Sequence, residues 1–296
     1  MQLIVFLLFY PILWFFSILP FKVLYFLSDC LYVVAYHIIG YRKKVVFGNL
    51  RLVFPEKDKK EIQNIAKEFY SHFIDIFFVE MVKSFTMSKS EITKRFKIHN
   101  TELLDKLYEE GKDAILLGAH YANWEWLFSL NLKIKYNGYA VYKKVNNKYL
   151  NKKIEETRGR FNTTLIPTKE IFDKMAENAN NNIRSLYGFL GDQSPKAHKA
   201  HHWNTFLGVY VPIYTGAEFL AKKYNMAIVF FKTKKIKRGY YESTLELLTD
   251  NPNNFDNYEL TDNFLKKAEQ QIIETPQYYL WTHKRFKHKD KKPVKN

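Results

Sequence analysis

A histidine and a glutamate follow a short apolar run in the middle of the chain. The run AILLGA occupies residues 114–119, and the next residues read HYANWEW, which places His120 and Glu125 five positions apart. A histidine with one ring nitrogen held by a carboxylate can use the other as a general base, typically contributing about 10²–10⁴-fold to a rate. This pair therefore predicts activation of a hydroxyl group for attack on a thioester carbonyl.

The spacing of this pair restricts its geometry. In a regular α-helix, residues five apart point about 140° away from each other. If the two side chains touch, His120 lies in the turn before a helix and Glu125 lies in the first turns of that helix. A capping histidine beside a surface glutamate is the structural alternative, because nine histidines among many carboxylates produce such pairs by chance. The position after a buried strand favours function, since catalytic groups gather at strand ends in α/β sheets.

The segments around this motif predict an α/β fold with a mixed, mainly parallel central sheet flanked by helices. Short continuous apolar runs are typical of strands covered on both faces, and they recur at 114–119, 138–142, 164–167, 186–190 and 226–231. Residues 240–248 alternate in the manner of an edge strand. Helices are predicted at 61–83, 101–110, 217–224 and 262–274. Because helical or loop segments separate most of the strands, the sheet is expected to be mainly parallel.

The N-terminus predicts an attachment to a membrane. No charged side chain occurs before Lys22, and residues 3–19 are almost wholly apolar, close to the ~17–25 residues that cross a bilayer. A cleaved signal peptide fits less well, because no basic residue precedes this run. The apolar stretch 23–39 contains Asp29 and His37, so it is expected to lie in the interface or under the domain. The basic residues 42–44 are expected against anionic headgroups on the cytoplasmic side.

Composition limits the partners. The formal net charge is +16, from 46 Lys and Arg against 30 Asp and Glu, which favours nucleic acid, phospholipid headgroups, phosphorylated sugars or acidic carrier proteins. The single cysteine, Cys30, excludes an internal disulfide and is expected to be buried. No metal site is predicted, because the histidines at 198, 201 and 202 lack acidic or thiol companions. The chain has neither a nucleic-acid recognition motif nor the G-x-S-x-G elbow of a lipid hydrolase.

The chain resembles the late acyltransferases of lipid A biosynthesis, the lauroyl and myristoyl transferase family. The signature of that family is a histidine, four residues and an acidic residue, typically followed by tryptophan, as in HYANWEW. One departure is Lys143-Lys144-Val145, where many members carry Arg-Pro. Further blocks lie on both sides of the HYANWEW motif in the family's order: YRK at 41–43, NL at 49–50 and FPE at 54–56 before it, and Tyr142 with Asn146, RGRF at 158–161, GDQ at 191–193, FLG at 206–208 and QYYLWTHKRF at 277–286 after it.

The resemblance implies a reaction and a location. An acyl chain would pass from acyl-carrier protein to a hydroxyl of a phosphorylated glucosamine lipid, the lipid A precursor, without cofactor or metal. The enzyme would work at the cytoplasmic face of the cell inner membrane. Hydropathy and charge along the chain divide it into three expected segments: a membrane anchor and interfacial segment (1–40), an acyltransferase domain (41–288) and a basic tail (289–296). Two alternatives remain open: transfer to another acceptor (an aminolipid, a glycolipid or a secondary-metabolite intermediate), and a non-enzymatic, basic, membrane-tethered binding protein.

The resemblance also implies roles for individual residues. His120 matches the general base of the family and Glu125 its orienting carboxylate. Arg158 or Arg160 matches an arginine region near the active site, and a guanidinium can bind phosphate or stabilise an oxyanion. Asp192 and Gln193 follow the run LYGFLG, so they are expected at the tip of another strand near the site, where they position the neighbourhood of His120, bind the acceptor or cap a loop. Asn123, inside the motif, is predicted to contact substrate.

Overall fold

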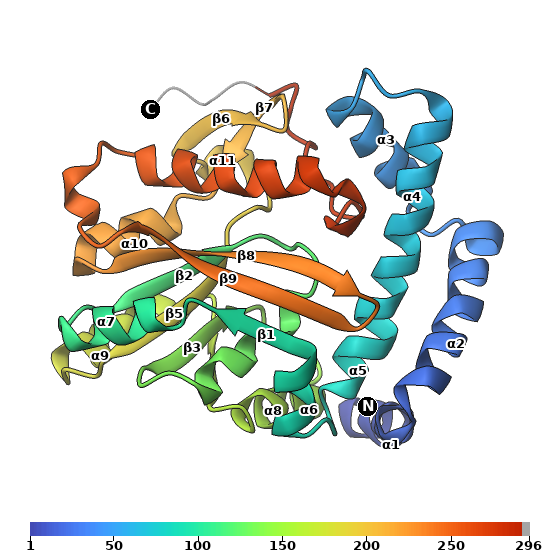
Figure 1. The fold of residues 1–296 in the computed structure, drawn as a ribbon, viewed down its shortest axis with the longest axis horizontal. Coiled ribbons are helices and arrows are strands. Elements are labelled where there is room, and N and C mark those ends of the chain that lie inside the picture. The colour runs from blue at the N-terminus through green and yellow to red at the C-terminus, as the bar shows by residue number, and fades with distance from the viewer. Residues whose placement is uncertain (292–296) are drawn as a thin grey trace.

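The computed structural model describes residues 1–291, and its centre is a seven-stranded β-sheet (Figure 1). The strand order is β1-β9-β8-β2-β5-β3-β4, and every neighbouring pair is parallel except β8 and β9. The predicted mixed, mainly parallel sheet is confirmed. Its strands are β1 (Phe96–His99), β2 (Ala114–Gly118), β3 (Asn137–Tyr142), β4 (Thr163–Pro167), β5 (Ser185–Leu190), β8 (Ala227–Lys237) and β9 (Tyr240–Thr249), and a separate hairpin contains β6 (His202–Phe206) and β7 (Val209–Ile213).

The sheet edge differs from the prediction. The segment expected at the edge became β9, which lies between β1 and β8. The edge strand beside β9 is β1. This strand is not predicted from the sequence because it has only four residues, which are buried and exposed in turn. Strand β1 pairs with only Tyr241–Thr244, so the rest of β9 has no neighbouring strand on that side. This explains why the residues of β9 alternate between apolar and polar as in an edge strand.

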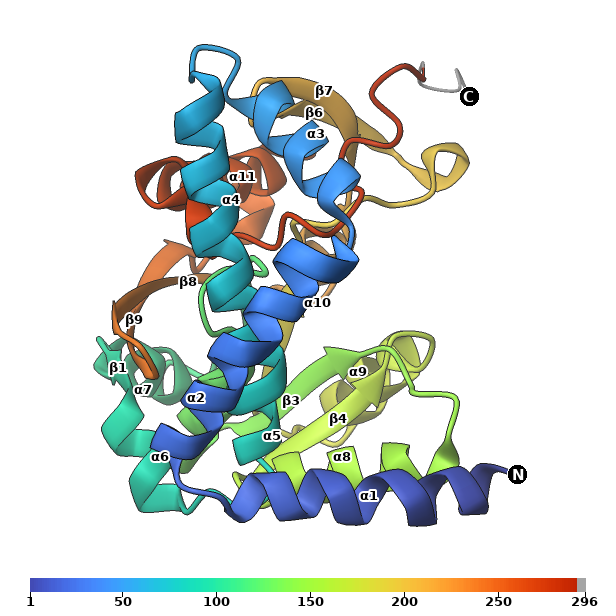
Figure 2. The same ribbon diagram turned by 90° about the vertical axis from the view of Figure 1, so that its right-hand side faces the viewer.

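Helices cover both faces and one end of the sheet (Figures 1 and 2). Helices α10 and α11 contact β2 on one face, whereas η3 and α8 contact β4 on the other. Helix α4 and its continuation η2 stand beside the sheet, and α2 packs on their outer side. The α-helices are α1 (Gln2–Ile18), α2 (Phe21–Tyr32), α3 (Lys43–Val53), α4 (Lys59–Ile74), α5 (Met81–Lys83), α6 (Lys89–Arg95), α7 (Glu102–Glu109), α8 (Lys148–Gly159), α9 (Ile171–Asn180), α10 (Gly216–Tyr224) and α11 (Glu259–Glu274). The π-helices are η1 (Val33–Ile39) and η2 (Asp75–Glu80), and the 3-10 helices are η3 (Glu125–Leu132), η4 (Ala197–Lys199), η5 (Pro252–Asn254) and η6 (Pro276–Tyr278).

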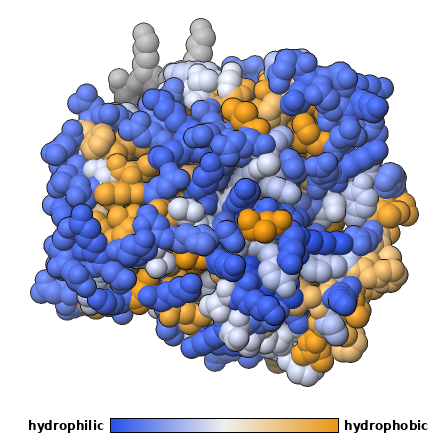
Figure 3. Space-filling model, viewed as in Figure 1, coloured by the Kyte–Doolittle hydropathy of each residue, from blue (hydrophilic) through white to orange (hydrophobic). Residues whose placement is uncertain are grey.

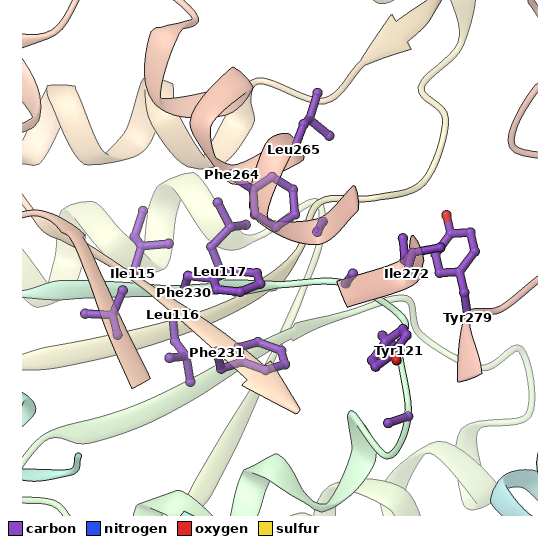
Figure 4. Packing of buried hydrophobic residues seen from close by; sticks show 14 of the residues in the cluster. Ile115, Leu116, Leu117, Tyr121, Phe230, Phe231, Phe264, Leu265, Ile272 and Tyr279 are labelled. Carbon is purple, nitrogen blue, oxygen red and sulfur yellow. The ribbon is translucent and has the colours of Figure 1, made fainter. Parts of the chain in front are cut away.

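Strand β2 lies in the middle of the hydrophobic core, and all five of its residues are buried. Figure 4 shows Leu117 on the side of β2 that faces Phe264 of α11, while Leu116 points to the other side with Phe231. The strand ends in a glycine because a Cβ at Gly118 would meet the Phe231 ring at 2.2 Å. This close packing fixes the point at which the chain leaves the sheet and reaches His120.

The first forty residues form two apolar helices that lie against the rest of the protein (Figure 2). Helix α2 and η1 are continuous over Phe21–Ile39, and within residues 1–291 this is the one helix long and apolar enough to cross a membrane. The sequence analysis expected the anchor in the first segment, but α1 is a shorter apolar helix of 17 residues. Cys30 is exposed on α2, so the prediction that it is buried is wrong. Of the predicted basic tail, residues 292–296 lie outside the described residues.

Candidate active site

His120 occupies the loop after β2, and Glu125 begins the 3-10 helix η3. His120 thus lies before the start of this helix and Glu125 in its first turn. The partner of the histidine is a different one, because Nδ1 of His120 lies 2.8 Å from Oδ1 of Asp192. The backbone N–H of His120 also donates to this oxygen, at 3.0 Å. The carboxylate that orients the imidazole in this structure is that of Asp192.

The pairing of His120 with Asp192 follows from the register of two parallel strands. Gly118, the last residue of β2, pairs with Leu190, the last residue of β5. Each of the two site residues is the second residue beyond its strand. Because the carboxyl ends of neighbouring parallel strands lie at the same edge of a sheet, the two side chains meet there. Asp192 thus lies at a strand tip near His120, as its place after the run LYGFLG predicts.

Asp192 is held in its ionised form. The carboxylate is 1% exposed, and burial alone would raise its pKa, but the attraction of His120 and the hydrogen bonds from its ring and backbone hold the pKa below its usual range. An ionised Asp192 accepts a hydrogen bond from the N–H of Nδ1, so the proton of the neutral imidazole stays on that nitrogen. It thereby leaves the lone pair of Nε2 free to act as a base.

The amide of Gln193 lies over the reactive side of the imidazole. Its Nε2 is 3.2 Å from Nε2 of His120. Because the proton of the imidazole is on Nδ1, where it makes the hydrogen bond to Asp192, Nε2 of His120 has a free lone pair and accepts a hydrogen bond from this amide. An acceptor hydroxyl must take the place of the Gln193 amide, or bind beside it, before its proton can reach His120. The predicted role of Gln193 near His120 is consistent with this position.

Glu125 is paired with an arginine and not with the histidine. Its Oε2 accepts a hydrogen bond of 2.6 Å from Nη2 of Arg158 on α8. Among residues 1–291 no hydrogen bond joins Glu125 to His120. The expected contact between them is therefore absent from this structure, because Arg158 lies within reach and Asp192 already occupies Nδ1.

Glu125 and Arg158 are the charged residues in the wall of an apolar cavity of about 120 Å³. The cavity lies on the side of the sheet to which Leu116 and Phe231 point. Trp124 belongs to its wall and connects it to His120, whose ring centroid lies 5.4 Å from that of Trp124. The remaining lining residues are Leu127, Phe128, Leu130, Asn131, Tyr139, Ala140, Val141, Thr163, Leu186, Gly188, Phe189 and Leu190. His120 itself is not among the lining residues, so Trp124 is the residue that the cavity and the histidine share as a neighbour.

Two other predicted site residues have structural contacts instead. The guanidinium of Arg160 donates to the carbonyl oxygens of Phe85 and Met87, at 2.5 and 3.0 Å, and does not line the cavity. Arg158 is thus the arginine of the pair that belongs to the site. Asn123 is fully buried: its amide donates to Glu80 at 2.5 Å, and its oxygen accepts from the backbone of Trp126 at 2.9 Å. Both ends of its amide are thus engaged in contacts within the protein, which do not support the predicted contact with substrate.

Asn123 is held by a buried carboxylate that the sequence analysis did not identify. Glu80 of η2 is fully buried and also accepts a hydrogen bond of 2.8 Å from the hydroxyl of Tyr241. Its backbone carbonyl accepts from the indole of Trp126 at 3.2 Å. The loop between His120 and Glu125 is therefore held in place by Glu80, through its hydrogen bonds with Asn123 and Trp126. This support helps Ala122 to keep a positive φ of 48°, which is unfavourable for alanine.

Burial raises the pKa of Glu80 from 4.5 to about 7, which gives a prediction on stability. Between these values the folded protein holds a proton that the unfolded chain has lost, so this carboxyl lowers the free energy of unfolding as the pH rises. In Glu80→Gln the free energy of unfolding should therefore fall less between pH 5 and 8 than in the wild type, by about 1–3 kcal/mol. Thermal or denaturant unfolding in detergent over this pH range measures the difference, and the exposed Glu110→Gln controls for the loss of a charge. Equal pH dependence in wild type and Glu80→Gln would contradict it.

The C-terminal block, residues 277–286, packs against the loop that carries His120. The backbone N–H of Leu280 donates to the carbonyl of His120 at 3.2 Å, and Ala122 donates to the carbonyl of Tyr278 at 2.9 Å. From the other side, the side chain of Asn49 donates to the carbonyls of Trp281 and His283, both at 2.9 Å. Blocks far apart in the sequence thus meet behind His120. Their wide separation in the chain explains why only the family resemblance connected them.

Trp281 and Arg285 in this block are core residues. Both are at most 1% exposed. Arg285 donates to the carbonyl of Pro212 at 3.2 Å and lies over the Phe206 ring. Burial, together with the positive charges nearby and against the attraction of Asp192, lowers the pKa of His283 to about 4, so His283 is neutral near neutral pH.

Metal ligation has no support in the described part of the chain, where no cluster of three or more His, Cys, Asp or Glu side chains could hold an ion. His202 makes a contact that resembles the active-site pair, with Nε2 at 2.8 Å from Oδ1 of Asp262. This second pair belongs to β6 and α11 and does not line the cavity.

The chain is similar in sequence to proteins of known function. The sequence model of the family described as "Bacterial lipid A biosynthesis acyltransferase" matches residues 2–288. The chain is 23% identical over 291 residues to the lipid A biosynthesis palmitoleoyltransferase of Escherichia coli (strain K12), with 93% of this chain and 89% of that protein covered. It is also 23% identical over 286 residues, with the same coverage, to the lipid A biosynthesis lauroyltransferase of that organism.

The family model and the named relatives identify the chain as an acyltransferase. Because the family's sequence model covers nearly the whole chain, the chain belongs to the bacterial lipid A biosynthesis acyltransferase family. The resemblance derived from the HYANWEW motif and the later blocks is confirmed.

Proposed function

We propose that this enzyme transfers a fatty acyl group from the thioester of acyl-carrier protein to a hydroxyl of a phosphorylated glucosamine lipid, the lipid A precursor. The reaction takes place at the cytoplasmic face of the inner membrane. The observation that carries this proposal is the His120–Asp192 pair beside the apolar cavity. The names of the relatives, which are lipid A biosynthesis acyltransferases, support the choice of acceptor. The net charge of +16 suits an acidic carrier protein and a phosphorylated lipid.

The proposed chemistry is a single displacement at the thioester carbonyl. Nε2 of His120 takes the proton of the acceptor hydroxyl as its oxygen attacks the carbonyl carbon, and Asp192 stabilises the imidazolium. The carbon–sulfur bond of the resulting tetrahedral intermediate then breaks. The proton passes from His120 to the departing thiolate, which leaves an ester and the free thiol of the carrier protein.

Arg158 is the cation available to this intermediate. Only Nη2 of its guanidinium is engaged, by Glu125, among the residues that the structure describes. The remaining N–H groups can donate to the oxyanion or to a phosphate of the acceptor. Glu125, which the family resemblance assigns to the catalytic pair, supports the reaction in this proposal by fixing Arg158.

An acceptor panel tests the proposal. Purified enzyme in detergent is incubated with acyl-carrier thioesters and, separately, with a phosphorylated glucosamine disaccharide lipid, an aminolipid, a neutral glycolipid and a lysophospholipid. Mass spectrometry should show one added acyl group on the glucosamine lipid alone, removable by mild base as expected for an ester. Acyl-coenzyme A of the same chain length is the control for the donor, and transfer should be slower with it. Acylation of another acceptor only would contradict the lipid A assignment and leave acyl transfer intact.

A further inference from the structure

Both N-terminal helices lie lengthwise on the catalytic domain, and this bears on how the enzyme meets a membrane. Helix α1 has 17 residues and is therefore ~26 Å long. At its N-terminal end, the carbonyl of Gln2 accepts from the side chain of Asn147 at 2.8 Å. At its C-terminal end, the carbonyl of Ser17 accepts from Lys83 at 2.7 Å and from Thr86 at 2.6 Å. Both ends of α1 are thus fixed to the same domain.

The contacts between these ends are continuous. The ring of Phe6 lies 5.7 Å from that of Tyr149 on α8, and Nζ of Lys153 lies 5.5 Å from the centre of the Tyr10 ring. Figure 2 shows α1 running beneath α8 along its length. Helix α8 reads KYLNKKIEETRG, and Lys148 and Lys152 are exposed on it. If α1 crossed the bilayer, these charged side chains of α8 would enter the hydrocarbon core beside it, at a cost of about 2.5–3.5 kcal/mol for each charge.

The same argument applies to α2, although the segment Phe21–Ile39 is long enough to span. Its Ser28 donates to Asp75 at 2.7 Å, and its Asp29 is paired with Arg238 at 2.6 Å. Arg238 also binds Asp75 at 2.7 Å. A transmembrane α2 would carry this group of charges into the bilayer.

The free sides of the two helices form one apolar surface. In Figure 3 apolar residues gather at the lower right of the molecule, where Figure 1 places α1 and α2. Exposed basic residues lie beside this surface at Lys22, Arg42, Lys44 and Lys148, so its rim complements anionic headgroups. Exposed large apolar side chains on it are Leu3, Ile4, Leu7, Leu8, Phe9, Ile12, Trp14, Phe15, Ile18, Val23, Phe26, Val33, Val34, Ile38 and Ile39.

We propose that α1 and α2 lie side-on in one leaflet of an anionic bilayer and do not cross it. This inference rests on the membrane association in the proposed function and specifies its geometry. Because α1 packs on α8, which carries Arg158, the lipid surface lies one helix away from the cavity. A lipid acceptor can then reach the site from the leaflet without leaving it.

A depth measurement tests this geometry. Cys30 is the only cysteine, so Cys30→Ser provides a background in which one engineered cysteine carries a fluorophore. Probes are placed at the exposed positions Ile4, Leu8 and Phe15, and at Asn181 on the C-terminal side of α9 as a control. Vesicles of phosphatidylcholine and phosphatidylglycerol contain nitroxide quenchers at a shallow or a deep position. Acyl transfer activity in detergent confirms that each labelled protein is folded.

The two geometries give different depth profiles. For helices that lie in one leaflet, the three probes on α1 should lie at the same depth, ~5–10 Å below the headgroups, and the probe at Asn181 should not be quenched. For a spanning α1, positions 4 and 15 would differ by about 16 Å in depth. That gradient would overturn this inference while membrane association stands. If the protein fails to bind the vesicles and no probe is quenched, the membrane association in the proposed function fails as well.

Discussion

Replacing Asp192 with asparagine should lower kcat by about 10²–10⁴-fold and leave the protein folded. The substitution keeps the shape of the side chain but removes the charge that stabilises the imidazolium. The amide can also donate to Nδ1 of His120, which would put the ring proton on Nε2 and remove the lone pair that the reaction needs. His120→Ala should cost at least as much, and the double variant no more than His120→Ala alone, because the two residues act as a unit.

The chain contains a matched control for this experiment. Asp262 makes the same 2.8 Å contact with His202, but this pair does not line the cavity. Asp262→Asn should therefore keep kcat within about twofold of the wild type. Unfolding temperature and vesicle flotation, measured on all variants, separate loss of chemistry from loss of structure. Near-normal turnover of Asp192→Asn together with an inactive His120→Ala would show that another carboxylate serves the histidine.

The strands that carry the site could be predicted because their sequence signal is local. Runs such as AILLGA are buried on both faces of the sheet, and such burial requires continuous apolar residues. The four-residue β1 gives no such signal, because only two of its residues are buried. The alternation in β9 describes a strand covered mainly on one face and does not reveal whether a neighbour lies beyond it.

The partner of His120 could not be read from spacing alone. Glu125 is near in sequence, which made it the obvious carboxylate, whereas Asp192 is 72 residues away. The sequence does contain a signal for Asp192, since His120 and Asp192 both come directly after or close behind apolar runs that predict strands. Using it required knowing that β2 and β5 are neighbours and that Gly118 pairs with Leu190. Glu80 and Arg285 gave no signal, because a charged residue in a helix or a C-terminal block is usually solvated.

The pair formed by Glu125 and Arg158 gives the second large effect. Arg158→Ala should lower kcat/KM by about 10²–10³-fold, as expected for the loss of a donor to the oxyanion. Glu125→Gln should lower it less, because the amide still accepts one hydrogen bond but no longer attracts the guanidinium. If Glu125 acts by fixing Arg158, adding Glu125→Gln to Arg158→Ala should cause little further loss, which corresponds to a coupling of about 0.5–3 kcal/mol.

A second cycle decides between the two roles of Glu125. The effects of Glu125→Gln and Asp192→Asn on the activation free energy should be additive, since no hydrogen bond joins Glu125 to the histidine within the described residues. The ion pair of Arg184 and Asp113, at 3.2 Å, is the control, because it lies where β2 and β5 begin, at the other end of the same strands. Arg184→Ala should change the unfolding temperature and leave kcat/KM within about twofold. If Glu125→Gln couples to Asp192→Asn and not to Arg158→Ala, Glu125 acts on His120 when substrate is bound, and the proposed role in fixing Arg158 is incorrect.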